Sequence, residues 1–65
     1  MERFEFITSD EFDKFIEVYG EDELTINDIE YEVKKHIVFD IDTAWEIMNW
    51  SLLNNGNLEV LIDIK

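Results

Sequence analysis

Paired carboxylates are the residues of this 65-residue chain whose types and spacing could do chemistry. Asp40 and Asp42 stand two positions apart, and Glu21, Asp22 and Glu23 are consecutive. Such groups can exchange protons with a substrate or hold Mg²⁺ or Ca²⁺. Neither has the fixed spacing and the turn glycine of a calcium-binding loop. We therefore expect no metal ion and no cofactor at these residues.

Residues 38–43 read VFDIDT, an apolar run that ends in two aspartates. The segment resembles the first motif of haloacid-dehalogenase-type phosphotransferases. That family has a further Thr or Val where this chain has Ala44, and it needs a distant Lys and acidic metal ligands on a far larger fold. We therefore set this resemblance aside and expect Asp42 or Thr43 to cap a following helix.

The chain has one histidine and no cysteine, which excludes a disulfide framework, a thiolate metal site and an imidazole cluster. His36 follows Lys34 and Lys35, and no motif places a serine or cysteine nucleophile near it. A core this small also leaves little room for a pocket of several hundred Å³. We expect a protein that is not an enzyme, with His36 at the surface or at a strand edge.

The strongest feature of the composition is its charge. Seventeen Asp and Glu stand against five Lys and Arg, for a formal net charge of −12, and ten of the acids fall between residues 10 and 32. DNA, RNA and an anionic bilayer surface would repel such a protein. A basic, nucleic-acid-binding surface on another protein is the partner that its field favours. The acids expected to make that contact are Asp10, Glu11, Asp13, Glu17, Glu21, Asp22, Glu23, Asp28, Glu30, Glu32, Asp40 and Asp42.

With 46% hydrophobic and 14% aromatic residues, the chain lies outside the composition range of disordered proteins. Its length predicts a single compact domain over residues 1–65, of limited stability. The N-terminus lacks a basic stretch followed by an apolar run, and no apolar span of 18 residues occurs. We therefore expect a protein of the host-cell cytoplasm that has no contact with membranes.

Residues 2–7 alternate apolar and charged side chains, which predicts a first strand. Thr8 and Glu11 then form a capping box that opens a helix, and Gly20 ends this helix as a left-handed cap. Acids 21–23 would follow the helix C-terminus, where they oppose the macrodipole. That placement suggests selection for something other than folding. The apolar face of the helix consists of Phe12, Phe15, Ile16 and Tyr19.

Residues 24–41 allow two interpretations, of which we favour a strand. Apolar residues occupy odd positions from Ile29 to Ile41, with polar residues between most of them. Asn27-Asp28 would form the turn of a hairpin between residues 24–26 and this strand. Glu30 and Glu32 would then lie about 6.6 Å apart on one face.

The alternative is a helix from about residue 26 to residue 36. Thr25 would cap it, with Asp28 three positions further on. Ion pairs four residues apart, from Glu30 to Lys34 and from Glu32 to His36, would support it.

Thr43 and Glu46 form a further capping box, which predicts a helix through Leu53 that is apolar around nearly its whole circumference. Residues 54–57 end this helix, and the alternation of residues 57–64 predicts a final strand. The expected fold is α+β in the order β-α-β-β-α-β, with an antiparallel or mixed sheet and two helices packed on one face. Trp50 with Leu53 could anchor a partner or a second copy of the chain, which would form a homodimer.

Small size, strong acidity, a compact core and the absence of catalytic or metal motifs resemble a known class of proteins. This class comprises the small acidic inhibitors that phages and other mobile elements use against host nucleic-acid enzymes, including anti-restriction proteins, anti-CRISPR proteins and uracil-DNA-glycosylase inhibitors. The resemblance implies a DNA mimic that blocks its target stoichiometrically. The target would be a basic nucleic-acid-binding protein such as a nuclease, CRISPR effector, glycosylase or polymerase, and the mimic itself would not bind nucleic acid.

Two other functions fit the same composition. An antitoxin or immunity-type protein that blocks a toxic nuclease would use the same electrostatics in a different biological pairing. An acidic adaptor or dimerisation module would use its charge for solubility alone, and neutralising Glu21, Asp22 and Glu23 would then leave its function unchanged.

Overall fold

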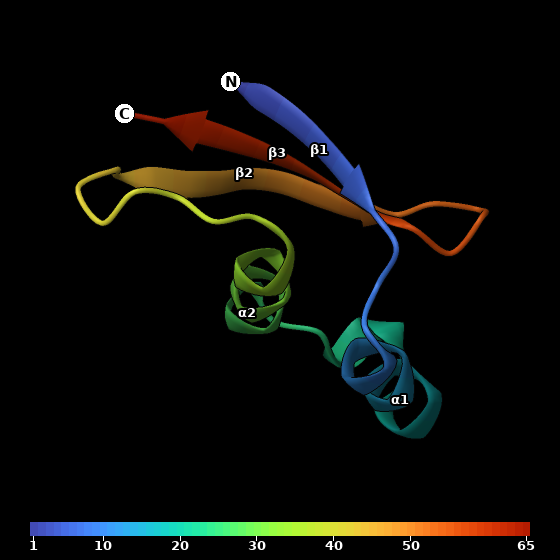
Figure 1. The fold of residues 1–65 in the computed structure, drawn as a ribbon. Helices are drawn as coiled ribbons and strands as arrows, with labels where there is room; N and C mark the ends of the chain where they lie inside the picture. Colours follow the sequence, from blue (N-terminus) through green and yellow to red (C-terminus); the bar gives the residue numbers. More distant parts are fainter.

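The computed structural model describes all 65 residues, which form a small α+β fold with two helices and a three-stranded antiparallel sheet (Figure 1). The elements are β1 (Glu2–Phe6), α1 (Asp10–Tyr19), the short 3-10 helix η1 (Glu21–Glu23), α2 (Ile26–His36), β2 (Trp45–Leu52) and β3 (Leu58–Ile64). The order is therefore β-α-α-β-β, and the predicted order β-α-β-β-α-β is wrong. The first strand, the first helix and the last strand lie where the sequence predicted them.

The last strand lies in the centre of the sheet, whose spatial order is β1-β3-β2. Val60 of β3 faces Phe4 of β1 on one side and Trp50 of β2 on the other. Because residues two apart on a strand share a face, Leu58, Val60 and Ile62 point to the same side, and all three are fully buried.

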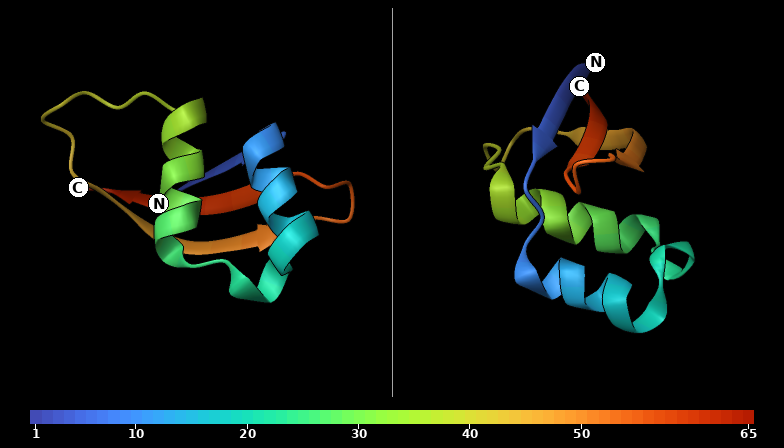
Figure 2. Two further views of the ribbon diagram at one scale, coloured as in Figure 1. Left: turned by 90° about the horizontal axis from the view of Figure 1, so that it is seen from below. Right: turned by 90° about the vertical axis from the view of Figure 1, so that its right-hand side faces the viewer.

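Both helices lie on the same side of the sheet (Figure 2). Helix α2 lies next to the face that carries the fully buried residues of β3, and α1 lies farther from the sheet. Side chains from this face and from the two helices make one hydrophobic core, to which the sheet and the helices contribute three buried residues each. The core residues are Phe12, Ile29, Val33, Leu58, Val60 and Ile62.

Residues 26–36 form a helix, so the favoured strand interpretation and its Asn27-Asp28 turn are wrong. Local hydrogen bonds explain the outcome. The Thr25 hydroxyl accepts from the Asp28 amide, and the Asp28 carboxylate accepts from the Thr25 amide at 2.9 Å, which completes a capping box. Lys34, Lys35 and His36 in the last turn also complement the helix dipole.

Residues 45–52 form strand β2, so the helix predicted from Thr43 through Leu53 is wrong. Ile47 and Asn49 pair with the adjacent residues Ile62 and Leu61 of β3, which leaves Met48 as the extra residue of a β-bulge. The bulge shifts the alternation by one position. Apolar side chains therefore face the core at positions 45 and 47 and again at 50 and 52, and this spacing resembles a helix that is apolar all round.

Residues 54–56 form the loop of the β2–β3 hairpin. The Gly56 amide donates to the Leu53 carbonyl at 2.9 Å, and the Leu53 amide donates to the Asn57 carbonyl at 2.9 Å. Gly56 has a φ of 87°, a conformation that other residues rarely adopt, so the loop has a turn followed by a glycine bulge. The sequence located this turn correctly but assigned it to the end of a helix.

Helix α1 is capped by Ser9, so the predicted capping box between Thr8 and Glu11 is wrong. The Ser9 hydroxyl accepts from the Phe12 amide at 3.3 Å. Thr8 is buried, and its hydroxyl donates to the Asp13 carboxylate. Gly20 ends the helix with a φ of 91°, but its ψ of 157° is extended, so it is not a left-handed helical cap.

Candidate acidic interface

Six of the twelve predicted acids lie together along α1 and η1, and we call these six the acidic face. The positions of Asp10, Asp13 and Glu17 place them on one side of α1, since residues three, four and seven apart share a helix face. Asp13 and Glu21 line a shared cavity of about 310 Å³ beside the β2–β3 turn, so the face continues from α1 into η1. Its members are Asp10, Asp13, Glu17, Glu21, Asp22 and Glu23.

The protein's own basic side chains neutralise few of the twelve predicted acids. Four of the five basic residues, all except Lys14, form ion pairs. Among the twelve predicted acids, Glu11 pairs with Lys35 at 3.0 Å and Glu30 pairs with Lys34 at 3.2 Å, and Glu32 lies 3.8 Å from Lys35. No member of the acidic face forms an ion pair with a basic side chain.

Several predicted acids have a role in folding that the sequence alone did not reveal. Asp13 accepts the Thr8 hydroxyl, and Asp28 completes the capping box of α2. Asp10 lies in the first turn of α1, where a negative charge interacts favourably with the helix dipole. The acidic face therefore combines charges that assist folding with charges for which the fold has no evident need, chiefly Glu17 and Glu21.

The position of the η1 acids does not support the inference that something other than folding selected them. They follow the C-terminus of α1, where negative charge is unfavourable, but they also precede α2, which begins at Ile26. Negative charge near a helix N-terminus is favourable, so the two dipole effects oppose each other. The position of Glu21, Asp22 and Glu23 is thus no sign that stability was given up for function.

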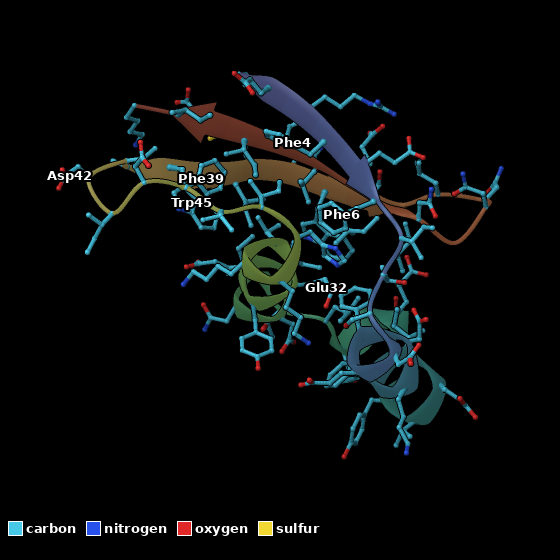
Figure 3. All side chains as sticks on the ribbon, viewed as in Figure 1. Phe4, Phe6, Glu32, Phe39, Asp42 and Trp45 are labelled. Atoms are coloured by element: carbon cyan, nitrogen blue, oxygen red, sulfur yellow. The ribbon has the colours of Figure 1, made fainter.

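Glu32 is buried, with 1% of its surface exposed, so its predicted place in the partner-binding surface is wrong. Figure 3 places it between the two helices. Its carboxylate accepts from the Ser9 amide and from the Ser9 hydroxyl, at 2.7 Å each, and lies 2.9 Å from His36 Nε2. Burial raises the pKa of Glu32, but the hydrogen bonds from Ser9 and His36 outweigh it and hold the pKa below its usual value. Glu32 joins α2 to the residue that caps α1.

Ser9, Glu32 and His36 are residue types found in hydrolase triads, but their order in space differs. In such a triad the histidine lies between the nucleophile and the carboxylate, so that it can take the hydroxyl proton. Here the carboxylate lies in the middle, and Ser9 Oγ donates to it. His36 instead stacks on Phe6, with ring centroids 4.2 Å apart. The arrangement ties elements together and does not activate a nucleophile.

Asp40 and Asp42 do not join the acidic face. They lie in the loop 37–44 at the other end of the molecule from α1, as the position of Asp42 shows (Figure 3). A strand and not a helix follows this loop, so the predicted cap by Asp42 or Thr43 is absent. Phe39 stacks on Trp45 with ring centroids 4.9 Å apart and holds the loop against the sheet.

The two residues predicted as an apolar interface are separated by the fold. Trp50 packs against the core from β2 and is half-buried. Leu53 is half-buried in the same cavity as Asp13 and Glu21, beside the acidic face. Of the pair, Leu53 alone lies where a partner of the acidic face would touch it.

Sequence reasoning missed an apolar groove between α1 and α2. Phe15 and Tyr19 from α1 and Tyr31 from α2 line it. The signal was present in part, because Phe15 and Tyr19 repeat at helical spacing. Tyr31 could be placed beside them only on the helix interpretation of residues 26–36.

Nowhere do three or more His, Cys, Asp or Glu side chains converge in a way that could hold a metal ion. Neither helix is long and apolar enough to cross a bilayer. Comparison with models of protein families, with characterised proteins and with solved structures finds no match to this chain.

Proposed function

We propose that this protein is a small acidic inhibitor, of the kind phages and mobile elements produce, that mimics nucleic acid and binds the basic channel of a host or defence protein. Its acidic face occupies the sites that phosphates would occupy. It acts stoichiometrically in the cytoplasm of the host cell and needs no catalysis.

The observation that supports this proposal is that no member of the acidic face forms an ion pair, even though Lys14 lies four positions from Asp10 and three from Glu17 on the same side of α1. Asp10, Asp13 and Glu17 advance along the axis of α1 by about 4.5 Å and then by about 6 Å, at the helical rise of 1.5 Å per residue. Duplex DNA presents one charge per about 1.7 Å of axis, and its binders meet it with Lys and Arg. Carboxylates held on a helix offer such a surface an ordered set of negative charges.

Fewer acids are available for the partner contact than the sequence predicted. Because Glu32 is buried and Asp40 and Asp42 lie at the far end of the molecule, we propose that α1 and η1 make the contact. Electrostatic steering would speed association with a basic surface, and this effect falls with ionic strength.

The experiment is capture from a bacterial lysate on the immobilised protein, followed by elution with duplex DNA or with rising NaCl. A column carrying the protein with Glu17→Gln, Glu21→Gln, Asp22→Asn and Glu23→Gln serves as the comparison. Basic nucleic-acid-binding proteins should elute with DNA from the first column and be depleted on the second. A captured protein that binds DNA and this chain at the same time would contradict the proposal.

A further inference from the structure

The groove between α1 and α2 has a volume of about 360 Å³. No strand residue lines it, so it opens on the side of the helix pair that faces away from the sheet. Phe12, which is buried, belongs to its floor, and Leu24 closes the end where the two helices are connected.

The apolar walls of this groove face water. Val18, Tyr19 and Tyr31 are 62%, 64% and 58% exposed, and the Phe15 and Tyr19 rings contact each other at 4.9 Å between centroids. The core of the sheet does not require these side chains to be apolar. Large aromatic side chains that line a groove are typical anchors for a partner, because they give contact area at low entropic cost.

Charges around the groove indicate the chemistry of its occupant. Lys35, which lines the groove, is neutralised by Glu11 and lies 3.8 Å from Glu32, so Lys14 is the single unpaired cation there. No residue of the acidic face lines the groove, but Asp10 and Glu17 lie four and three positions from Lys14, which does line it, and η1 follows α1 at the end where the two helices are connected. A second copy of this chain would bring its own charge of −12 to the same place, which disfavours self-association.

We infer that the groove binds an amphipathic helix of the partner, with apolar side chains on Phe15, Tyr19 and Tyr31 and basic side chains toward the acidic face. The helices that frame it have 10 and 11 residues, so it can take about three turns of a third helix. The inference deepens the proposed function, on which it rests for the basic character of the partner. It adds an apolar contact that salt does not screen.

The test uses two fluorescent 14-residue helical peptides of equal positive charge. One has leucines at positions i, i+4, i+7 and i+11 of a lysine-rich helix, and the other has glutamine at those positions. Wild-type protein should bind the leucine peptide at least about tenfold more tightly, in line with a few buried apolar side chains. The preference should vanish in Tyr19→Ser with Tyr31→Ser. It should persist in Val38→Ser with Ile41→Ser, which removes exposed apolar side chains elsewhere.

A milder substitution, Val18→Ser, should partly reduce the preference for the leucine peptide. It provides the test if the double variant does not fold. Equal binding of both peptides would overturn the inference that the groove binds an amphipathic helix, but it would not contradict the proposed function of the acidic face. Neutralising Glu17, Glu21, Asp22 and Glu23 should weaken both peptides alike, and failure of that result would count against the proposed function instead. A dimer in sedimentation that Tyr31→Ser dissociates would assign the groove to self-association and overturn the inference.

Discussion

The buried carboxylate of Glu32 accepts two hydrogen bonds from Ser9, one from its backbone amide and one from its hydroxyl. Since Ser9 also caps α1, this contact fixes the start of α1 against α2. The acidic face lies on α1, and the groove lies between the two helices. One buried ion thus positions both of the surfaces that we assign to partner binding.

Replacing Glu32 by Gln should lower the free energy of unfolding by about 2 kcal/mol, because the change removes a charged acceptor and leaves buried donors poorly paired. The matched control is Glu30→Gln, which breaks an exposed ion pair with Lys34 and should cost at most about 0.5 kcal/mol. Urea unfolding at pH 7 measures both. Equal losses in the two variants would show that Glu32 has no special role.

The stability difference between wild type and Glu32→Gln should depend on pH. The folded-state pKa of Glu32 is lowered, so its contribution is fully present above the ordinary glutamate value of 4.5 and is lost as pH falls through the folded pKa. Other carboxylates titrate in both proteins, and their effects largely cancel in the difference. Urea unfolding between pH 7 and pH 3 should therefore show the gap closing on the acid side; a gap that widens there would contradict the account.

Salt should stabilise the protein. Most cations are already paired, so the dominant electrostatic effect is repulsion among unpaired carboxylates. The Debye length falls from about 30 Å at 0.01 M to about 3 Å at 1 M salt, which screens this repulsion. We expect the urea midpoint to rise between 10 mM and 500 mM NaCl. A fall would mean that the ion pairs outweigh the repulsion.

Trp50 should matter for stability and not for association, contrary to the role the sequence suggested. It packs on the core from β2, so Trp50→Ala should cost about 3 kcal/mol, somewhat less than a fully buried indole. Met48→Ala, at the exposed bulge residue of the same strand, should cost under about 1 kcal/mol. Thermal unfolding compares the stabilities of the two variants, and sedimentation compares their oligomeric states. A change of oligomeric state in Trp50→Ala without loss of stability would restore the interface hypothesis.

The sequence predicted those elements in which local pattern and tertiary environment agree. Residues 2–7 and 57–64 largely alternate polar and apolar side chains, and Glu2–Phe6 and Leu58–Ile64 form strands. For residues 26–36, the apolar spacing fitted a strand over part of its length, but a capping box and ion pairs between neighbouring turns favoured the helix that forms. Capping was the better guide here, because hydrogen bonds at a helix start are local and need no distant partner.

The chain from residue 45 to residue 52 could not have been assigned by period alone. A single bulge residue, Met48, changes which positions face the core, and the bulge depends on pairing with β3. The sequence also could not separate the buried acid from the exposed ones, because burial depends on tertiary packing. Glu32 looks like any other acid of residues 10–32, and only the packing of α2 against Ser9 buries it.

The central claim is that the position of the acidic face, and not the total charge, directs this protein to a basic nucleic-acid-binding surface. The most direct measurement is the affinity for a captured target, as a function of NaCl, of two variants that each lose four negative charges. One carries Glu17→Gln, Glu21→Gln, Asp22→Asn and Glu23→Gln; the other carries Glu2→Gln, Asp40→Asn, Asp42→Asn and Asp63→Asn. We predict at least about a tenfold loss of affinity and a shallower salt dependence for the first, and little change for the second. Equal losses in both variants would contradict the claim.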